Sequence, residues 1–422
     1  MADVRPFPGD FYNSARVPDL SAVVVPPYDV ISPADRAVFA ARHPASAVHV
    51  DLPEAPAGAD RYAHAAEILA GWRRDRILVR DEKPAFYLIT QKFTHGGREF
   101  VRRGIFARVK LSPFGDGDVF PHEATLPGPK QDRLALMRAT KGNLSPIFGL
   151  YEDADGAVKA LLDAAAGEPP RIAFWTEREG ECQLWAISDP ERVDRLASLL
   201  RSKRLIIADG HHRYETALAY RAERRAAEGN PSGEQPYDFI LMACVAFEDP
   251  GLLILPTHRI VKDRKGISPA ELLKRISGDF EIRLTGGGLG GLLGAMGREN
   301  SRVPLGLYDD GKFYLLLPNP GALERGLAKL PAALRGMNTA ALQNMILGPH
   351  LGVVSKEELA YTPDAAEAVR RVDASEGAMA FFLNAISAAD LREIALAGQV
   401  TPPKTTYFFP KLPTGAVFHL FE

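Results

Sequence analysis

The sequence predicts an α/β or α+β fold with mixed sheets. Apolar runs of strand length alternate with stretches of helical periodicity, and hairpin signals lie among them. Hydrophobic residues make up 46% of the 422 and charged residues 25%, which is typical of a globular protein. Such a length exceeds one ordinary compact core. We expect an N-terminal α/β domain (1–165), a central domain (166–330) with a peripheral insertion from about 262, and a C-terminal α/β segment (331–422) that completes the fold.

Prolines and glycines mark the element boundaries in the first third of the chain. Pro26 and Pro27 end a short buried strand because proline cannot donate to a sheet ladder. Ser32 is placed as the N-cap of a helix whose first position is proline, and Gly96-Gly97 forms a hairpin turn. The elements expected here are a strand (22–25), a helix (33–43), a strand (46–53), a helix (60–78) and a β-hairpin (84–111).

The same signals predict the later elements. A loop rich in glycine and proline opens into a helix near Asp132, and a hairpin turns at 309–311. The glycines of 286–291 match G-x-G-x-x-G, but glycine weakens the helix that follows and a hairpin comes next, so we predict no dinucleotide site there. Strands are expected at 171–177, 182–188, 204–209, 377–384, 405–409 and as a pair within 236–261, and helices at 191–200, 214–227, 338–347, 363–372 and 386–397.

Charge and cysteine content argue against several classes of protein. The formal net charge of −2 is unlike that of a protein that coats nucleic acid or an anionic membrane. Two cysteines far apart in sequence cannot build a disulfide framework or a cysteine metal site. The N-terminus lacks the apolar core of a signal peptide, and no stretch reaches the roughly 18 apolar residues of a membrane span. We expect a cytoplasmic protein that acts on a small molecule, away from membranes and nucleic acid.

The segment "IIADGHHRYETALAYRAE" carries the densest set of candidate site residues. A strand ends in Asp209, Gly210 forms the junction, and a helix follows at once. The start of a helix has free backbone N–H groups and partial positive charge, and it binds phosphate well. Arg213 adds a bidentate fork for phosphate oxygens, and His211 and His212 add donors that can be charged near neutral pH. This pattern predicts a phosphate- or nucleotide-binding site.

Asp209 does not fit a passive anion site, because a carboxylate repels phosphate. It fits a helix N-cap, a Mg²⁺ ligand, or a base that takes a hydroxyl proton. Two other interpretations of the segment remain at this point, a capped helix with a polar first turn and a zinc site. The zinc site has less support, because adjacent histidines point in different directions on a helix and no third ligand is suitably spaced.

A second group of candidates lies in the loop "PHEATLPGPKQDRL". Glu123 is a candidate general base, and Lys130 or Arg133 is a candidate charge clamp on a transferring phosphoryl group. His122 is a candidate substrate contact. Reactive groups often sit on such loops, although a solvated turn with Asp132 capping the next helix accounts for the same residues.

Two further stretches contribute single candidates. In "PPKTTYFFPKLPTG", Lys404 either flanks a final strand or reaches the anion site. In "VVVPPYDVISP", Tyr28 and Asp29 follow a buried strand, which is a usual place for site residues in open α/β sheets. A turn stiffened by two prolines explains the second stretch equally well.

Four motifs, in this order and across nearly the whole chain, resemble a bacterial and archaeal family. They are "VVPPYDVIS", "FPHEATLPGPKQDRLALMRATKGNLSPIFGLY", "IADGHHRYETAL" and "PPKTTYFFPKLPTG". The family is a domain of unknown function, number one thousand and fifteen, whose members are conserved hypothetical proteins. Gln343 departs from its pattern, in which a histidine is usual, so the resemblance implies no role for that position.

The box "DGHHR" is also similar to the phosphate-binding box of the ParB-like and sulfiredoxin-like fold. That resemblance implies a phosphate-binding element within a larger elaborated chain. The kinase branch, which includes free-serine kinases, carries a DGH-type box that matches Asp209, Gly210 and His211. The reactive cysteine of sulfiredoxin is replaced by His211, so the resemblance does not extend to sulfinic acid reduction.

Residues and resemblance together predict a phosphotransferase. A phosphoryl group would pass from ATP, ADP or pyrophosphate, with Mg²⁺ bridging its oxygens, to the hydroxyl of a small metabolite, by analogy free L-serine. The alternatives are a non-catalytic nucleotide-binding regulatory protein of ParB-like type and a phosphate-ester hydrolase. The expected catalytic residues are Asp209, Glu123 and His211. Phosphate would be bound by Gly210, His211, His212, Arg213, Lys130, Arg133 and Lys404. The substrate would be bound by Tyr28, Asp29 and His122, and the metal by Asp209.

Overall fold

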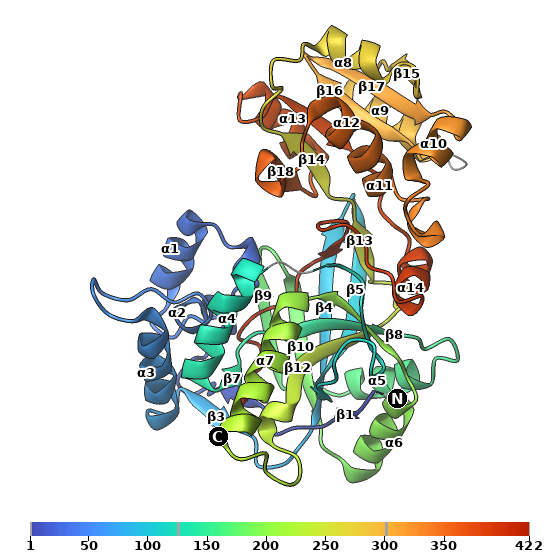
Figure 1. The fold of residues 1–422 in the computed structure, drawn as a ribbon. Helices are drawn as coiled ribbons and strands as arrows, with labels where there is room; N and C mark the ends of the chain where they lie inside the picture. The colour runs from blue at the N-terminus through green and yellow to red at the C-terminus, as the bar shows by residue number, and fades with distance from the viewer. Residues whose placement is uncertain (1, 125–126, 300–302, 422) are drawn as a thin grey trace. The chain divides into compact units, whose positions relative to one another are not determined.

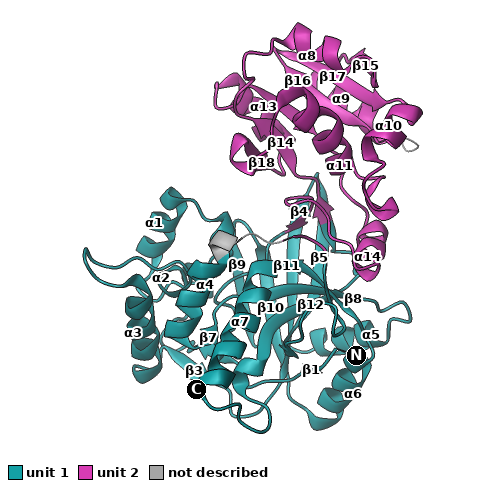
Figure 2. Cartoon of the chain, in the orientation of Figure 1, with its two compact units in different colours: residues 1–121, 125–253, 410–422 teal, residues 122–124, 254–409 magenta. Residues whose placement is uncertain are grey.

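The computed structural model describes residues 2–124, 127–299 and 303–421, and the chain divides into two compact units (Figure 2). Unit 1 consists of residues 1–121, 125–253 and 410–422, and unit 2 of residues 122–124 and 254–409. The expected boundaries after residues 165 and 330 both fall inside a unit. The reason in unit 1 is that strands from both sides of residue 165 pair within one sheet.

A nine-stranded mixed sheet organises unit 1 (Figure 1). The strand order is β6-β11-β8-β12-β5-β4-β10-β9, and β1 pairs with β5 outside this path. The pairs β6/β11 and β8/β12 are parallel, whereas β8/β11, β12/β5 and β4/β5 are antiparallel, so the prediction of a mixed sheet is confirmed. The strands are β1 (Val4–Arg5), β4 (Phe86–His95), β5 (Arg98–Lys110), β6 (Val119–Pro121), β8 (Ile147–Tyr151), β9 (Ile172–Thr176), β10 (Gly180–Ile187), β11 (Leu205–Asp209) and β12 (Phe239–Ala246).

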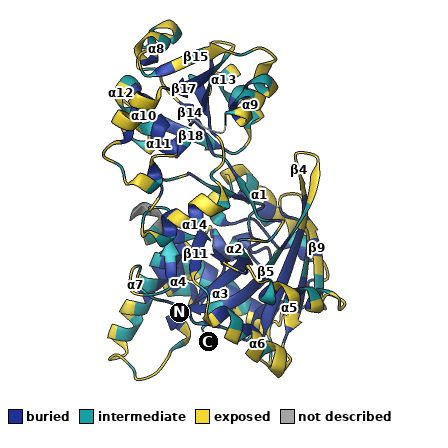
Figure 3. Cartoon of the chain, turned by 90° about the vertical axis from the view of Figure 1, so that its right-hand side faces the viewer, coloured by how far each residue is buried: buried dark blue, intermediate teal, exposed yellow. Residues whose placement is uncertain are grey.

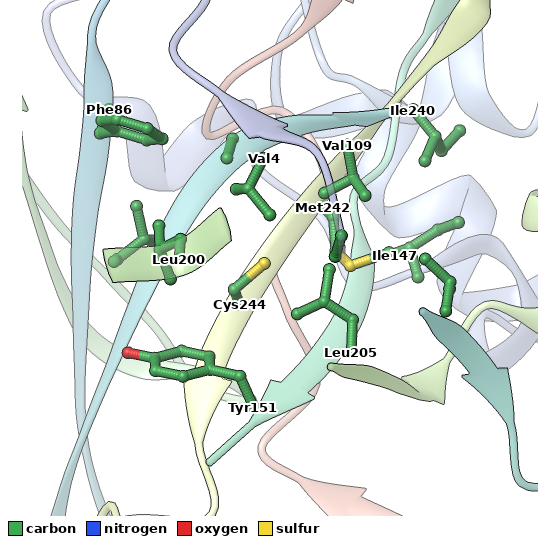
Figure 4. Close-up of a cluster of buried hydrophobic side chains, with 14 of the residues drawn as sticks. Val4, Phe86, Val109, Ile147, Tyr151, Leu200, Leu205, Ile240, Met242 and Cys244 are labelled. Carbon is green, nitrogen blue, oxygen red and sulfur yellow. The ribbon is translucent and has the colours of Figure 1, made fainter. Parts of the chain in front are cut away.

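The core of unit 1 lies against this sheet. Strand β12 reads FILMACVA and is buried over almost its whole length, as expected for a central strand that is covered on both faces. Its Met242 and Cys244 pack with Val109 of β5 and Ile147 of β8 (Figure 4). Buried residues follow the strands, while exposed residues concentrate on the outer faces of helices and in loops (Figure 3).

Helices and two small sheets complete unit 1. The expected helix at residue 33 begins where predicted, because Ser32 and Asp35 form a capping box. The helices are α1 (Pro33–Arg42), α2 (Val48–Asp51), α3 (Arg61–Arg74), α4 (Pro127–Thr140), α5 (Ala157–Ala166), α6 (Pro190–Arg201) and α7 (His211–Ala227), with 3₁₀ turns at Leu20–Ala22, Tyr28–Val30 and Pro236–Asp238. The small sheets pair β2 (Asp10–Tyr12) with β3 (Leu78–Arg80), and β7 (Gly142–Asn143) with β21 (His419–Leu420). Among the described residues, no helix combines the length and the apolar character needed to cross a membrane.

Unit 2 is built on a six-stranded sheet in the order β15-β17-β16-β19-β14-β18, in which neighbouring strands are antiparallel. Its strands are β14 (His258–Val261), β15 (Phe280–Leu284), β16 (Leu305–Asp309), β17 (Lys312–Pro318), β18 (Leu359–Thr362) and β19 (Met379–Phe382). Its helices are α8 (Pro269–Ile276), α9 (Gly288–Arg298), α10 (Pro320–Leu327), α11 (Asn338–Leu342), α12 (Gly348–Leu351), α13 (Ala365–Asp373) and α14 (Ala388–Leu396), with a π-helix at Gln343–Leu347. The short strands β13 (Leu253–Leu255) and β20 (Tyr407–Phe409), and 3₁₀ turns at Ala332–Leu334 and Lys356–Glu358, complete the elements.

Three sequence predictions about elements are wrong. The stretch 22–25 is no strand, since Ala22 ends a 3₁₀ turn and only Val25 makes a bridge, to Thr414. The stretch 46–53 contains the helix α2 and no strand, because Val48, Val50 and Asp51 are buried within one helical turn in place of an extended run. The residues from 262 to 330 are no peripheral insertion, because they supply β15, β16 and β17 of the sheet in unit 2.

Candidate functional site

The DGHHR box has the strand–glycine–helix form that the sequence predicts. Strand β11 ends at Asp209 and α7 begins at His211, so Gly210 alone forms the junction. Gly210 has a φ of 96°, in the left-handed region that disfavours other residues. A Cβ atom at this position would lie 3.0 Å from Nη2 of Arg213. Glycine therefore permits both the sharp turn and the return of the Arg213 side chain over it.

Asp209 is not the helix N-cap. The N-cap is Gly210, which has no side chain to satisfy the first backbone N–H groups of α7. The left-handed glycine places Asp209 one residue before the cap, where its carboxylate turns to other partners. The start of α7 thus has no side-chain cap and presents the positive end of the helix dipole, which favours an anion.

A buried network of charges lies at this helix start. Asp209 Oδ2 accepts a hydrogen bond from Arg213 Nη2 at 2.7 Å, and Asp209 Oδ1 accepts one from Lys411 Nζ at 2.5 Å. Arg213 Nη1 also donates to the carbonyl oxygen of Pro146 at 2.6 Å. The side chains of Arg213, Asp209 and Lys411 are 8%, 17% and 10% exposed, so water screens these charges weakly.

The charge on Arg213 is maintained in spite of its burial. Desolvation alone lowers the pKa of a buried guanidinium, but the nearby Asp209, Asp29 and Tyr28 outweigh it and raise the pKa of Arg213. Burial also raises the pKa of the Tyr28 hydroxyl to about 12, with a further contribution from Asp29. At neutral pH the network therefore contains a cationic Arg213 and a neutral Tyr28.

A second arginine adjoins the first network. Arg133 of α4 donates to the backbone oxygen of Asp51 at 2.6 Å and to Asp132 Oδ2 at 2.8 Å. Its guanidinium lies 4.0 Å above the centre of the Tyr28 ring. Only 5% of Arg133 is exposed, so this arginine holds α2 and Tyr28 in place, and its contact with a phosphate stays a prediction.

A small cavity, which we name the Asp51 chamber, lies between α2, α4 and α7. Its volume is about 30 Å³. Arg213 forms part of its wall, so the chamber and the charged network share one side chain. Its polar lining consists of Asp51, Arg133, Thr140, Asn143, Ser145, Arg213 and Thr216, and its apolar lining of Leu136, Met137, Leu144 and Ile240, with Gly142 beside them.

Three polar atoms of the chamber lining lack a hydrogen-bond partner among the described residues. They are Asp51 Oδ2, Asn143 Nδ2 and Thr216 Oγ1. The three residues are 2%, 3% and 1% exposed. Burial raises the pKa of the Asp51 carboxyl, against the opposing effect of Arg133 and Arg213. A buried carboxyl with a raised pKa and an unpartnered oxygen is suited to proton transfer.

Other predicted residues of unit 1 lie on the same elements. His211 is buried and His212 half-buried in the first turn of α7. Lys130 of α4 forms an ion pair with Glu215 of α7 at 2.5 Å, so its ammonium joins two helices. Asp29 is exposed on the 3₁₀ turn that carries Tyr28, and its charge acts on Arg213. The proposed phosphate and substrate contacts of these residues remain predictions.

His122, Glu123 and Lys404 belong to unit 2, and their part in the site remains a prediction. His122 is fully buried, and its Nε2 lies 2.9 Å from the Thr406 hydroxyl. Glu123 pairs with Thr401 in a single parallel bridge. Lys404 is exposed. Thr125 of the same loop lies outside the described residues.

The contacts of Asp209 do not fit its expected role as a Mg²⁺ ligand. Both carboxylate oxygens of Asp209 contact a cationic side chain, so neither is directed at a metal. No group of three or more metal-ligating side chains occurs among the residues that the structure describes. In proteins, Mg²⁺ is commonly held by one or two carboxylates together with the phosphates of a bound nucleotide. The transfer assay described below therefore includes reactions with and without Mg²⁺.

Sequence reasoning missed Asp51 and chose a different lysine. Asp51 ends a stretch whose apolar alternation predicts a strand, so nothing in the local pattern marks it as a site residue. Lys411 lies in the motif that contains Lys404, and it is the lysine that reaches Asp209. No local signal separates Lys411 from Lys404, because only the folded chain brings Lys411 to Asp209.

Comparisons with known proteins give a family match and several distant structural likenesses. The family described as "Protein of unknown function (DUF1015)" matches residues 4–343. A conserved hypothetical protein from Pyrococcus furiosus has 13% identity and a TM-score of 0.35, with 73% of this chain and 90% of that chain covered. A structure titled free serine kinase in complex with AMP has 12% identity and a TM-score of 0.34, with 72% and 86% covered.

A C-terminally truncated SbnI from Staphylococcus aureus is a further structural likeness, with 9% identity and a TM-score of 0.37. It covers 73% of this chain and 85% of that chain. No curated protein matches the sequence. At these identities and TM-scores, the solved structures do not decide the activity.

Proposed function

The chain belongs to the family described as "Protein of unknown function (DUF1015)", and we propose its activity from the geometry of the site. We propose that it is a phosphotransferase that moves a phosphoryl group from a nucleotide or pyrophosphate to the hydroxyl of a small metabolite. One observation carries the proposal. Arg213 and Lys411 both bind the carboxylate of Asp209 at the uncapped start of α7. Two cations and the positive end of a helix dipole thus meet at one oxygen-binding position.

A phosphoryl group of the donor can replace the Asp209 carboxylate on these two cations. Phosphate oxygens suit the bidentate fork of Arg213, and Lys411 adds a point charge. Phosphoryl transfer depends mainly on positioning and on charge stabilisation, and partly buried cations supply more of both than exposed ones. The raised pKa of Arg213 keeps this cation charged throughout the neutral range.

The test is phosphoryl transfer by the purified full chain, followed by phosphorus NMR. ATP, ADP and pyrophosphate are supplied separately, each with and without L-serine and with and without Mg²⁺. Arg213→Ala is the variant of the site. Arg224→Ala is its matched control, since Arg224 lies on the same helix and pairs with Glu228 at the surface. Circular dichroism establishes that each variant is folded.

We expect serine-dependent O-phosphoserine from at least one donor, with transfer lost in Arg213→Ala and kept in Arg224→Ala. Donor binding without any phosphorylated product would overturn the proposal in favour of a nucleotide-binding regulator. Orthophosphate released at the same rate with or without acceptor would overturn it in favour of a hydrolase.

A further inference from the structure

The unpartnered atoms of the Asp51 chamber differ in chemical type and come from three elements. Asp51 Oδ2 is an acceptor on α2, Asn143 Nδ2 a donor on β7, and Thr216 Oγ1 a hydroxyl on α7. Buried polar groups are almost always paired, so three unpaired ones around one cavity need an explanation. A group that both donates and accepts hydrogen bonds satisfies them, and a hydroxyl does so.

We propose that the Asp51 chamber receives the hydroxyl-bearing end of the phosphoryl acceptor and that Asp51 takes up the hydroxyl proton. This inference rests on the proposed function and deepens it, because it names the acceptor class and the base. Arg213 links the two parts, since its guanidinium binds Asp209 in the charged network and the residue is part of the chamber wall. An acceptor oxygen in the chamber lies beside the cation that holds the donor.

The proton and the electron pairs balance in this step. The acceptor oxygen forms a bond to the phosphorus of the terminal phosphoryl group, and its proton passes to Asp51 Oδ2. The bond between that phosphorus and the bridging oxygen of the donor breaks. Its electron pair leaves with the shortened nucleotide or with phosphate.

The carboxyl of Asp51 is free for this role because other groups hold α2. Arg133 binds the backbone oxygen of Asp51 at 2.6 Å and the side-chain Oδ1 only at 3.4 Å. The Ser145 hydroxyl is 3.5 Å from the same Oδ1. Oδ2 therefore has no hydrogen-bond partner among the described residues, and Asp51 lines the chamber.

The size of the chamber defines the acceptor class. A volume of about 30 Å³ admits a group the size of one or two water molecules. The apolar wall of Leu136, Met137 and Ile240 suits a methylene group. The acceptor is thus a primary alcohol that inserts a hydroxymethyl group, such as L-serine, whereas the added methyl group of L-threonine has no room.

The experiment combines two chamber variants with one control in the transfer assay. Asp51→Asn removes the base and keeps the shape. Thr216→Val removes an unpartnered hydroxyl at constant volume. Glu179→Gln is the control, because Glu179 is equally buried in unit 1 and burial raises its pKa, but it bonds to Thr176 at the end of β9 and does not line the chamber.

We expect Asp51→Asn to lower kcat at least about 100-fold, the usual contribution of a general base, with donor Kd changed less than about threefold. Thr216→Val should lower kcat/KM for L-serine about tenfold without lowering Tm, because no folded-state hydrogen bond is lost. Glu179→Gln should leave kcat within about threefold of the wild type, because Glu179 does not line the chamber. L-threonine should be phosphorylated at least about 100-fold less efficiently than L-serine.

Two results separate the failure of this inference from that of the proposed function. Transfer in the wild type, with Asp51→Asn equally active or L-threonine as good as L-serine, would overturn the chamber assignment and leave the phosphotransferase standing. Absence of transfer from every donor to every alcohol would overturn both.

Discussion

The two units bury charge in different ways. In unit 1, Asp209, Arg213 and Lys411 form one connected group, and the Asp51 chamber with its unpartnered atoms adjoins it. In unit 2, the buried Arg259 donates to the backbone oxygens of Thr257 and Pro403, and the half-buried Arg264 pairs with Asp309. These two cations of unit 2 are held by separate contacts, whereas Arg213 and Lys411 of unit 1 meet on Asp209, where we propose that the donor phosphate binds.

Cavity size alone would place the candidate site in unit 2 and not in unit 1. A larger cavity, about 210 Å³, lies in unit 2 between α11 and α14. Its two charged lining residues, Asp390 and Glu393, are both exposed. Exposed carboxylates are screened by water and add little to binding. The smaller chamber in unit 1 is the better candidate because its lining charges are desolvated.

The largest expected effect comes from the shape of the cation in unit 1. Arg213→Lys keeps the charge but loses the fork that contacts Asp209 and Pro146 together. We expect kcat for transfer to fall at least about 100-fold in steady-state assays, as when one transition-state donor is removed. The control Arg224→Lys on the outer face of α7 should stay within about twofold of the wild type. Equal activity of both variants would contradict a special role for the network.

The pH dependence of stability should be visible in unit 2. Burial lowers the pKa of His258 to about 4, below its usual value near 6.5. Because the folded-state pKa is depressed, His258 contributes stability above pH 6.5 that is lost as pH falls toward 4. The loss should reach roughly 2–3 kcal/mol in urea unfolding followed by circular dichroism, and His258→Gln should reduce this dependence.

Tryptophan fluorescence provides the control for that experiment, because Trp72, Trp175 and Trp185 all lie in unit 1. Burial also lowers the pKa of His419 in unit 1, to about 3. Unit 1 should therefore lose stability of its own as the pH falls from about 6.5 toward 3. The substitution at His258 should leave the fluorescence transition unchanged. If His258→Gln shifted the fluorescence transition as well as the circular dichroism transition, the effect of His258 would not be confined to unit 2.

Gly210 should be less replaceable than a glycine with the same kind of backbone conformation elsewhere. Gly210→Ala combines a φ of 96° with a Cβ that crowds Arg213. Gly229, after the end of α7, has a φ of 69° and open space around it. We expect Gly229→Ala to cost about 1 kcal/mol of unfolding free energy and Gly210→Ala about 2 kcal/mol with weakened donor binding, measured by urea unfolding and calorimetry. Equal losses without any change in donor Kd would show that Gly210 serves the turn alone.

The smallest expected effect distinguishes two lysines of one motif. Lys411→Gln should raise the donor Kd about tenfold, because it removes one of the two cations on the anion position. Lys404→Gln should change it less than about twofold, since Lys404 is an exposed residue of unit 2. Calorimetric titration with pyrophosphate measures both. A larger effect at Lys404 would return that residue to the site, as the sequence predicts.

Local sequence patterns predicted the features of unit 1 that depend on local rules. The Ser32 cap, the Gly96-Gly97 hairpin and the junction at Gly210 each require a particular residue at a particular place, and the structure has all three elements. Asp51 could not be found in this way. It becomes a site residue only because α4 and α7 pack beside α2, which joins residues far apart in sequence.

The division into units was also beyond local reasoning. The chain leaves unit 1 after residue 253 and returns at residue 410. Pairing between distant strands decides the boundary. Lys411 contacts Asp209 across 202 positions of sequence, a separation that no motif spacing encodes.

The most direct test of the account concerns the anion position itself. If the donor phosphate replaces the Asp209 carboxylate on Arg213 and Lys411, then Asp209→Asn removes a competing negative charge. Calorimetric titration with ATP, ADP and pyrophosphate should therefore show binding to the wild type that strengthens about tenfold in this variant for at least one donor. Absence of binding by all three donors, or binding that weakens in Asp209→Asn, would contradict the account.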